Sequence, residues 1–372
     1  MKVLFLGEYS GVFMELSKGL NKIGIETYRV SSGDSFKKYT ADYLVNLKKT
    51  NRFNKVFSSF FGLSYLLDFL RIWHELKNKI ENYDIVQLNN PRFLPFGDLI
   101  NMYILHYVSK HNGKIFLSVL GDDYYVDKWN YKNNKKMPLY ASTSIKKKVV
   151  KRGLWERFLT DYCIKKCTGI IPGALTYKYP YQWSAKICPV IPFACDENRI
   201  GTPFTFKDSE PVFIFHGWQK GKETRKGNDV FDRVLKKVVN KYGDKVIYKV
   251  VQNVPFDEYQ KLYSACHIFI DQLYASDKGT NGMYGMAAGK VVFSGFQKEC
   301  LEAYEHYNGE EVGIPASLNE DDLFNQFCDL IDNRKRMERI SENAIRFVKD
   351  NHGATVVTKQ FLNTWNIFSA GT

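Results

Sequence analysis

Short apolar runs alternate with helical patterns through the first part of the chain. Residues 2–6 form an apolar run that ends at a glycine turn, and apolar positions across 12–23 recur at helical spacing. Residues 26–32 again favour a strand, so the chain opens with the strand, helix, strand order of a parallel, doubly wound sheet. Apolar runs at 83–90 and 114–123 continue the sheet, and each of them ends in polar residues.

The polar residues that follow these strands indicate where a ligand would bind. In a doubly wound sheet, the ligand crevice lies beyond the carboxyl ends of the strands. The residues that we expect at this edge in the first half are Gly7, Glu8, Tyr9, Ser10, Gly11, Asn89, Asn90, Asp122 and Asp123. Any single one could instead be an ordinary loop residue. Asp122 and Asp123 could orient a substrate hydroxyl, remove its proton, or simply cap the next helix.

The same alternation begins again in the second half. A helix over 154–167 and two short buried-type strands, 169–173 and 186–196, lead to a linker with glycine and proline. The later elements that the pattern predicts are strands at 211–217, 245–251, 267–272 and 291–295 and helices at 229–242 and 256–265. A chain of 372 residues is too long for one typical core and suits two α/β domains.

We therefore expect an α/β protein with two Rossmann-like domains that face each other across a cleft. The first domain spans 1–197 and the second spans 198–352. Residues 353–372 are predicted to form a C-terminal helix that packs back on the first domain. The N-terminal apolar run breaks at Gly7, so neither a signal peptide nor a membrane span fits, and we expect a cytoplasmic protein.

The net charge indicates which ligands the chain could bind, and the cysteine spacing indicates whether it could bind a metal. The net charge of +13 indicates an acidic partner, which could be a nucleic acid, an anionic lipid or a phosphorylated ligand. The sequence has no recognition helix, zinc finger or RNP-like string, so we place nucleic-acid binding behind the other two. The seven cysteines lack the paired spacing of a zinc site, and we expect buried thiols and no bound metal.

Residues 267–295 carry the clearest signature of an anion-binding site. A strand is expected to end near Asp271, and a helix of small residues is expected over 283–288. The loop between them contains Gly279, Thr280, Asn281 and Gly282, and the helix opens with Met283 and Tyr284. Glycines before a helix allow its backbone amides to approach an anionic group, and the helix N-terminus favours negative charge. A diphosphate is the natural ligand, although a purely structural loop would look the same.

The sequence around this loop resembles that of a large enzyme family. The string GMAAGKVVFSG at 285–295 is similar to EAMAAGKPVV, a signature of the retaining GT-B glycosyltransferases often called family 4. LYSACHIFIDQL at 262–273 resembles the family's YRSADVFVLPS, VIPFACD at 190–196 resembles VIPNGVD, and RKGNDVF at 225–231 resembles the KG-x-D segment. The matches occur in the family's order and cover most of the second half. The first half matches in architecture alone.

The resemblance implies a GT-B fold and transfer of a sugar from a nucleotide-sugar donor, with retention and without a metal or other cofactor. It also implies that the first domain binds the acceptor and the second binds the donor, so residues 7–11, Asn89 and Asn90 are expected on the acceptor side. A nucleic-acid-binding protein that glycosylates DNA is an alternative.

In the segment HGWQKGKETRKG at 216–227, the resemblance implies that Lys226 and one further basic residue grip the donor diphosphate. The candidates for that second cation are Lys220, Lys222 and Arg225, and the other residues expected beside the donor are His216 and Gly217. We expect loss of Lys226 to slow turnover and to leave the fold intact. A solvated basic turn is the alternative.

The chain departs from the family at two glutamates. Family members carry two glutamates eight positions apart, the later of which holds the donor ribose, and Ser276 and Tyr284 occupy these positions here. Asp271 or Asp277 could supply a compensating contact, and we expect Tyr284 to line the donor pocket. Leu120 stands where the family's first domain often has a histidine. These replacements leave open a non-catalytic protein that binds a sugar nucleotide.

The resemblance also implies a saccharide or polyprenyl-linked saccharide acceptor and a role in assembling capsule, lipopolysaccharide or another cell-surface glycan. The run SIKKKVVKRGLWERFL at 144–159 places a basic cluster beside aromatic residues, which suits an anionic membrane at the cytoplasmic face of the inner membrane. The cluster comprises Lys146, Lys147, Lys148, Lys151 and Arg152, followed by Leu154, Trp155 and Phe158. Residues 53–73 add further apolar positions. Solvated surface and core packing are the alternatives.

Overall fold

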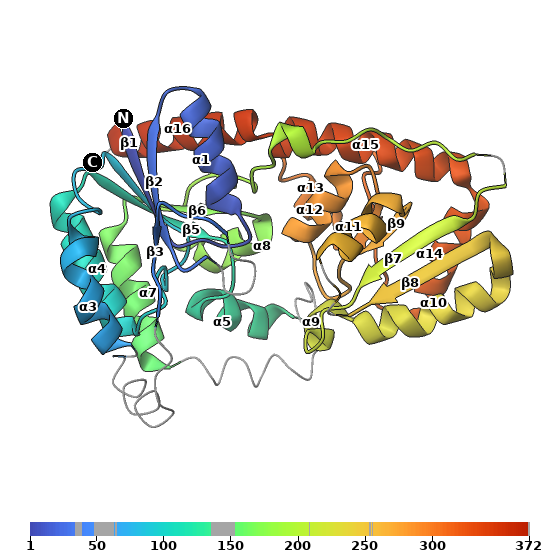
Figure 1. The fold of residues 1–372 in the computed structure, drawn as a ribbon, viewed down its shortest axis with the longest axis horizontal. Coiled ribbons are helices and arrows are strands. Elements are labelled where there is room, and N and C mark those ends of the chain that lie inside the picture. Colours follow the sequence, from blue (N-terminus) through green and yellow to red (C-terminus); the bar gives the residue numbers. More distant parts are fainter. Residues whose placement is uncertain are drawn as a thin grey trace. The chain divides into compact units, whose positions relative to one another are not determined.

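The computed structural model describes residues 1–33, 39–47, 63, 65–134, 153–207, 209–252, 254 and 256–370. Within these residues the chain divides into two compact α/β units (Figure 1). Unit 1 contains the described parts of Met1–Trp129, Lys147–Ala194 and Ala354–Thr372, and unit 2 contains those of Asn130–Lys146 and Cys195–Gly353. Each unit is built around its own parallel sheet.

Unit 1 contains a six-stranded sheet with the order β3-β2-β1-β4-β5-β6. Its strands are β1 (Lys2–Leu6), β2 (Glu26–Ser31), β3 (Tyr43–Leu44), β4 (Ile85–Leu88), β5 (Lys114–Val119) and β6 (Gly169–Pro172). Its helices are α1 (Val12–Lys22), α3 (Leu66–Lys77), α4 (Asp98–His111), α7 (Leu154–Lys166), α8 (Leu175–Lys178) and α16 (Ala354–Ala370), with the 3-10 turn η2 (Tyr179–Tyr181); α5 (Tyr124–Asn133) begins in this unit. The apolar residues of β1 and β4 are buried, as expected where helices cover both faces of a parallel sheet.

The last helix of the chain, α16, is part of unit 1. It packs against α1, where a β-carbon on Gly19 would lie 2.3 Å from the hydroxyl oxygen of Thr358. Trp365 is buried and donates its indole N–H to the side-chain oxygen of Gln87 on β4 at 3.0 Å. Gln87 in turn donates to Ser118 on β5 at 2.9 Å. The C-terminal helix is therefore hydrogen-bonded to the centre of the first sheet.

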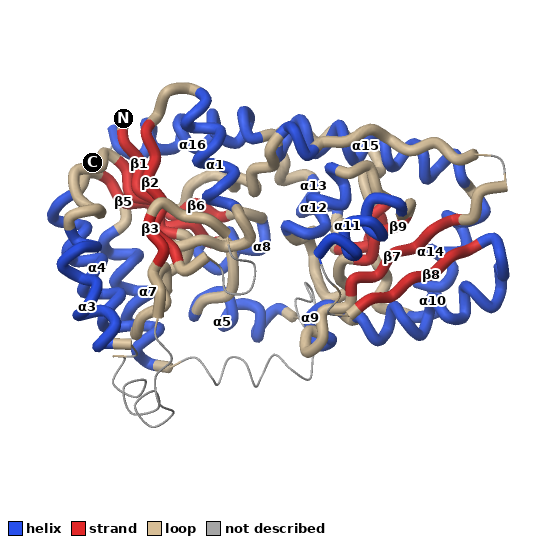
Figure 2. Tube along the Cα trace, in the orientation of Figure 1, coloured by secondary structure: helices blue, strands red, loops and turns tan. Residues whose placement is uncertain are grey.

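Unit 2 contains a five-stranded sheet with the order β11-β10-β9-β7-β8. Figure 2 labels three of these strands, β9, β7 and β8. Its strands are β7 (Val212–Gly217), β8 (Val246–Val251), β9 (Ile268–Ile270), β10 (Val291–Ser294) and β11 (Ile314–Pro315). Its helices are α9 (Glu223–Lys226), α10 (Asn228–Tyr242), α11 (Phe256–Ala265), α12 (Thr280–Ala287), α13 (Lys298–Leu301), α14 (Glu320–Asp332) and α15 (Arg334–His352), with the 3-10 turns η3 (Glu197–Arg199) and η4 (Gly243–Lys245). One apolar stripe of α10 faces the core, and it contains Val230, Phe231, Val234, Leu235 and Val238.

The strand predicted over 186–196 is wrong. The segment is irregular apart from isolated bridges at Ile187 and Cys195. Pro189 and Pro192 give the physical reason, because a proline has no N–H group to donate to a neighbouring strand. Most apolar residues of this segment are buried, whereas Ile187 and Val190 are half-buried, and the segment makes a few backbone hydrogen bonds to β6 without forming a regular strand.

The helix predicted over 283–288 begins three residues earlier than expected. α12 starts at Thr280, and Gly279 is extended at its N-cap. Gly282, which we expected in the loop, is a buried residue of the first helical turn. The side chain of Asp271 lies so close to Gly282 that no larger residue fits without displacement, which explains a glycine inside this helix.

Among the described residues, the structure shows no disulfide, no membrane-spanning helix and no cluster of metal ligands. All seven cysteines are buried thiols without a disulfide. None of the described helices is both long enough and apolar enough to cross a membrane. Across the same residues, no group of three or more histidine, cysteine or acidic side chains is placed to hold a metal ion.

Candidate functional site

The carboxyl ends of β7 and β9 bring an ion pair together. β7 ends at Gly217 and β9 ends at Ile270, and the two strands are neighbours in the sheet of unit 2. Lys226 is the last residue of α9, and Asp271 directly follows β9. The Nζ of Lys226 lies 3.0 Å from Oδ1 of Asp271 and donates to the Asp271 carbonyl oxygen at 3.2 Å. The side chain of Lys226 is 18% exposed and that of Asp271 is 1% exposed, so the lysine is the partner that reaches solvent.

This pairing changes the expected cost of removing Lys226. Without the lysine, the buried carboxylate of Asp271 would keep its hydrogen bond from Ser294 and lose its counter-ion. An uncompensated buried charge is strongly destabilising. Contrary to the expectation from sequence, we therefore expect the fold to be sensitive to Lys226.

The first turn of α12 adjoins this ion pair. Gly279 occupies the N-cap and has no side chain with which to accept hydrogen bonds from the amides of the first turn. A β-carbon on Gly282 would lie 2.7 Å from Oδ2 of Asp271, so the carboxylate rests against the first turn. Lys226 and the helix N-terminus therefore flank the same buried carboxylate, and both of them favour a bound anion.

Tyr284 lies one turn further along α12 and is half-buried. The guanidinium of Arg199, from η3, lies 5.1 Å from the centre of its ring. Helical side chains point back toward the helix N-terminus, so the Tyr284 ring flanks the turn that Gly279 caps. The other predicted residues of this helix differ in exposure: Thr280 is half-buried, Asn281 is exposed and Met283 is buried.

His216 lies beneath this edge rather than on it. The side chain is buried, and its ring nitrogens lie 2.9 Å from the Tyr248 hydroxyl oxygen and 3.1 Å from the Asn228 amide oxygen. Burial is the main cause that lowers the pKa of His216 to about 4, so the ring is neutral at pH 7. His216 thus supports the strand end and supplies no positive charge to a ligand.

Trp218 is a residue of this edge that the sequence analysis missed. It directly follows β7 and stacks on His216 with ring centroids 5.9 Å apart. Its indole N–H donates to Oε1 of Glu223 at 3.0 Å, and the backbone N–H of Gly221 donates to the same oxygen at 3.0 Å. The turn that these bonds hold carries the exposed Lys220 and Lys222 and the half-buried Arg225 and Lys226. The position of an aromatic residue at a strand end was the signal available in the sequence.

Asp277 is turned into the interior of unit 2. One carboxylate oxygen lies 3.3 Å from the Nζ of Lys278, and the other accepts from the Tyr304 hydroxyl at 2.8 Å. All three residues are less than a tenth exposed. Of the two acids that could compensate for the missing glutamates, Asp271 therefore contacts the candidate cation, whereas Asp277 is enclosed in a separate cluster.

In unit 1, the start of α1 is already filled by a carboxylate. Oε1 of Glu8 accepts from the backbone N–H groups of Tyr9 at 2.7 Å and Phe13 at 3.3 Å, and Oε2 accepts from that of Met14 at 3.0 Å. Burial raises the pKa of Glu8, and these N–H groups and the charge of Arg29 oppose the rise. The chain itself thus supplies the anion at this helix N-terminus.

Two glycines in the turn between β1 and α1 allow the chain to fold back over the sheet edge. Gly7 and Gly11 have φ angles of 90° and 82°, which favour glycine. At Gly7 a β-carbon would lie 2.1 Å from the amide oxygen of Asn89, so two predicted acceptor-side residues are in close contact. Tyr9 is 45% exposed, and its ring lies near Gly121 after β5.

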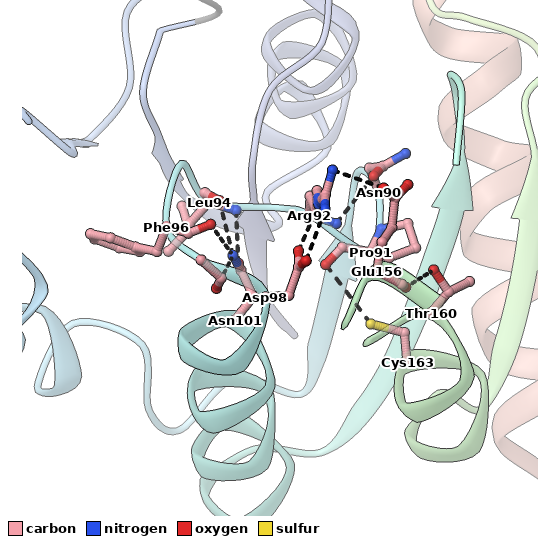
Figure 3. Close-up of polar contacts among 11 residues, drawn as sticks. Asn90, Pro91, Arg92, Leu94, Phe96, Asp98, Asn101, Glu156, Thr160 and Cys163 are labelled. Carbon is pink, nitrogen blue, oxygen red and sulfur yellow. Dashed lines mark hydrogen bonds and ion pairs between the residues drawn. The ribbon is translucent and has the colours of Figure 1, made fainter. Parts of the chain in front are cut away.

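An ion-pair cluster fixes the loop after β4 (Figure 3). Arg92 donates from Nε and Nη2 to the two oxygens of Asp98 at 2.6 and 2.8 Å, and its Nη1 lies 2.8 Å from Glu156. Asp98 opens α4 and Glu156 lies in the first turn of α7. The side chain of Asn90 accepts from the Arg92 backbone at 3.1 Å, and Asn101 bonds the backbone further along the loop. The cluster therefore ties the predicted acceptor-side loop to two helices.

Asp123 acts as a helix cap. Its Oδ1 accepts from the backbone N–H of Val126 at 2.9 Å, and its Oδ2 accepts from the Tyr181 hydroxyl at 2.6 Å. The residue is 1% exposed, which agrees with the capping role that we considered for this pair. Asp122 is half-buried beside it.

An apolar groove lies between α4 and α7 on unit 1. It has a volume of about 460 Å³ and is lined by Met102, Trp155, Phe158, Asp161, Tyr162 and Lys165. Leu154, at the start of α7, is 72% exposed, so apolar surface extends beyond the groove. The basic cluster Lys146, Lys147, Lys148, Lys151 and Arg152 and the apolar residues 53–62 lie outside the described residues.

Comparison with solved structures identifies the fold. The chain aligns with sucrose-phosphate synthase from Thermosynechococcus elongatus with a TM-score of 0.62 and 12% identity, covering 100% of this chain and 99% of that one. Anabaena HepE in complex with UDP-glucose gives a TM-score of 0.58 and 12% identity, covering 99% and 100%. The lipopolysaccharide outer core galactosyltransferase WaaB gives 0.54 and 14%, covering 100% of both chains. Scans against protein-family models and curated proteins found no match.

These similarities extend over the full length and agree with two parallel α/β sheets of six and five strands. At 12–14% identity they concern the fold and leave the reaction to be argued from the site. The chain has the GT-B fold and is similar in structure to GT-B glycosyltransferases.

Proposed function

We propose that the protein is a glycosyltransferase that transfers a sugar from a nucleotide-sugar donor to a saccharide acceptor. Unit 2 is the donor-binding domain and unit 1 is the acceptor-binding domain. The observation that carries the proposal is the meeting of Lys226, Asp271 and the first turn of α12 at the carboxyl edge of β7 and β9. Similarity to HepE, which was solved with UDP-glucose and with UDP, supports the assignment of a nucleotide-sugar donor.

The donor diphosphate lies against the first turn of α12 in this proposal. Its oxygens accept from backbone N–H groups of Thr280, Asn281 and Gly282, and Lys226 lies beside it as a cation that Asp271 holds in place. When the bond between the sugar and the diphosphate breaks, the diphosphate leaves with the electron pair. A fixed cation at the point where this negative charge develops lowers the barrier. Arg225 or Lys220 provides further positive charge on the same turn.

The acceptor hydroxyl forms the new glycosidic bond. With retention of configuration, as the family resemblance implies, its proton passes to the departing phosphate. Asp123 is already occupied by Val126 and Tyr181, which supports a proton acceptor other than Asp123. We assign Asp122, Asn89, Asn90 and the turn from Gly7 to Gly11 to the acceptor side.

Tyr284 and Arg199 replace the contact that a glutamate makes in related enzymes. The stacked pair flanks the first turn of α12, where the nucleoside would continue from the diphosphate. A ring and a guanidinium offer a stacking face and hydrogen-bond donors, whereas a carboxylate offers acceptors. We therefore expect the donor nucleoside to be held partly by stacking.

An anionic membrane surface is the partner that we propose for the apolar groove of α4 and α7. Trp155, Phe158 and Leu154 would enter the interface, and Lys165 lies on the same side of α7. This fits a polyprenyl-linked saccharide acceptor in cell-surface glycan assembly. Sedimentation with vesicles should show stronger binding to anionic than to neutral lipid, and Trp155→Ser/Phe158→Ser should weaken it.

A second candidate is a protein that binds a sugar nucleotide without turnover. Ser276 and Tyr284 at the positions of the family glutamates favour it. Thermal shift with UDP-, GDP- and ADP-sugars, followed by measurement of donor hydrolysis, separates the candidates. We expect at least one sugar nucleotide to stabilise the protein and to be hydrolysed slowly without an acceptor. Binding without hydrolysis or transfer would favour the second candidate, and binding of none of them would contradict both.

A further inference from the structure

The loop from Asp271 to Gly279 joins β9 to α12, and it is anchored at both ends. At its start, Asp271 is paired with Lys226. Near its end, the adjacent residues Asp277 and Lys278 both point into the interior of unit 2, where they meet Tyr304. The residue after them, Gly279, is the N-cap of α12. The second anchor therefore directly precedes the helix start.

The three side chains of this second anchor satisfy one another. The Nζ of Lys278 lies 3.3 Å from Oδ1 of Asp277 and donates to the Tyr304 hydroxyl oxygen at 2.7 Å. Tyr304 donates its hydroxyl hydrogen to Oδ2 of Asp277 at 2.8 Å. The exposed fractions are 6% for Asp277, 5% for Lys278 and 7% for Tyr304. The Tyr304 ring packs against Phe347 and His352 of α15, so the cluster fastens the loop to a long helix.

Stability alone does not explain a buried ion pair in this position. Two charges that leave water lose hydration energy, and well-packed apolar residues of similar size often give an equally stable fold. A buried polar cluster with all its partners in place does, however, restrict the chain to one conformation. Here the conformation that it restricts is the backbone leading into the first turn of α12.

We propose that Asp277, Lys278 and Tyr304 are positioning residues that hold the start of α12 in the geometry needed by the donor diphosphate. The inference rests on the proposed donor site. The cluster does not touch the ligand in this account. It acts by ordering the first-turn amides before the ligand arrives, so that their ordering does not reduce the affinity.

Tyr304→Phe is the mildest variant that opens the cluster. It keeps the ring that packs on Phe347 and removes the hydroxyl that joins Asp277 to Lys278. Tyr242→Phe is a matched control in the same unit, because the Tyr242 hydroxyl also donates to a carboxylate, Asp332, at 2.7 Å. Tyr242 ends α10, a helix of 15 residues that begins at the donor edge, so it lies about 20 Å from that edge.

The experiment compares full-length wild type and variants by calorimetric titration with UDP, GDP and ADP and with the corresponding nucleosides. Tyr304→Phe should weaken binding of the preferred nucleoside diphosphate by about tenfold, or about 1.4 kcal/mol. Binding of the nucleoside should change much less, because the ordered amides contact the diphosphate. Tyr242→Phe should bind both ligands as wild type does.

Three outcomes would overturn parts of the account in distinguishable ways. If wild type binds none of the nucleoside diphosphates, the proposed donor site fails and the inference fails with it. If wild type binds but Tyr304→Phe binds equally well, only the inference is wrong. Equal weakening of diphosphate and nucleoside would also contradict it, since a general loss of structure acts on both. Should Tyr304→Phe not fold, the double variant Asp277→Asn/Lys278→Met, which leaves no buried charge without its partner, is measured in its place with the same expected outcome.

Discussion

The N-termini of α1 in unit 1 and α12 in unit 2 differ in which group accepts hydrogen bonds from the first-turn N–H groups. Each helix follows a strand of its parallel sheet, so its first-turn N–H groups lie at the carboxyl edge. At α1, the carboxylate of Glu8 accepts from the N–H groups of Phe13 and Met14. At α12, the N-cap is Gly279, which offers no acceptor. The chain's own Glu8 thus accepts from the first-turn N–H groups of α1. The Asp271 carboxylate lies beside the first turn of α12, and in our proposal a ligand accepts from the N–H groups of that turn.

This difference gives a physical reason why, in our proposal, the two units bind different substrates although their sheets are similar. A helix N-terminus attracts negative charge, and the Glu8 carboxyl group already accepts hydrogen bonds from the N–H groups at that place in unit 1. The nearby Arg92 is paired with Asp98 and Glu156. In unit 2, the cation Lys226 is paired with the single carboxylate of Asp271. This pair has no net charge, and Lys220, Lys222 and Arg225 on the same turn add positive charge. An anionic donor therefore suits unit 2, and a neutral sugar hydroxyl suits unit 1.

Removing the cation of unit 2 should have the largest effect. Lys226→Met should lower kcat by roughly 10²–10³-fold, because the departing diphosphate loses a fixed positive charge. It should also lower the free energy of unfolding, by up to about 3–5 kcal/mol, because Asp271 is left buried without its counter-ion. Transfer or donor hydrolysis measures the first effect, and urea unfolding measures the second.

The double variant Lys226→Met/Asp271→Asn is the control for this prediction. It removes both charges, so much of the lost stability should return. Turnover should stay low because the cation is still missing. If turnover recovers together with stability, Lys226 acts through the fold and has no direct role in catalysis.

Acidification should weaken unit 2 through His216. The folded-state pKa of about 4 lies below the ordinary value of 6.5, so between these values the unfolded chain binds a proton that the folded ring does not. The free energy of unfolding should therefore fall as pH falls through this window, by roughly 3 kcal/mol in total from this residue. Urea unfolding between pH 7.5 and 4.5 should show a smaller fall for His216→Gln. A fall equal to that of wild type would contradict the prediction.

A β-carbon in the first turn of α12 should weaken donor binding. In Gly282→Ala the new carbon would lie 2.7 Å from Oδ2 of Asp271, so the carboxylate or the helix must move. Overpacking of this kind costs about 1–3 kcal/mol, which the better helix propensity of alanine partly offsets. We expect affinity for the preferred nucleoside diphosphate to fall by about tenfold in calorimetric titration. Gly153→Ala is the control, because a β-carbon there meets no atom within 4 Å.

The smallest effect should come from Glu8 and should have the opposite pH dependence to that of His216. Burial raises the pKa of Glu8, so its favourable contribution is complete below the ordinary value of 4.5 and is lost as pH rises through the folded-state value. Glu8→Gln keeps an acceptor oxygen and removes the titration. The variant should gain stability relative to wild type as pH rises from 4 to 7 in urea unfolding. A difference that is constant with pH would show that the carboxyl group does not titrate as proposed.

Much of the fold was predictable from the pattern of apolar residues. β1 and α11 have the predicted bounds, because each is bordered by a clear change of pattern. The segment 186–196 was not predictable in the same way, since most of its apolar residues are buried by tertiary packing while its prolines interrupt strand pairing. α14 and α15, beyond the last motif, were not predicted although both have an apolar stripe.

The residues of the candidate site could be predicted from the sequence, but the contacts between them could not. The sequence identified Lys226 and Asp271 separately, but their pairing depends on β7 and β9 being neighbours, which only the strand order reveals. Asp277 and His216 are polar residues beside a strand or helix end, and nothing local distinguishes a buried polar side chain from one at the surface. The hydrogen bonds between Glu8 and the first turn of α1 likewise depend on how the chain folds back at Gly7.

The central claim is that the donor diphosphate binds at the start of α12 and not at the start of α1. The most direct measurement is a crystal structure of the full chain with the nucleoside diphosphate that gives the largest thermal shift. We predict phosphate oxygens within hydrogen-bond distance of the backbone N–H groups of Thr280–Gly282 and of the Nζ of Lys226, with Glu8 still bonded to Phe13 and Met14. A diphosphate at the start of α1 with Glu8 displaced, or one that contacts neither α12 nor Lys226, would contradict the account.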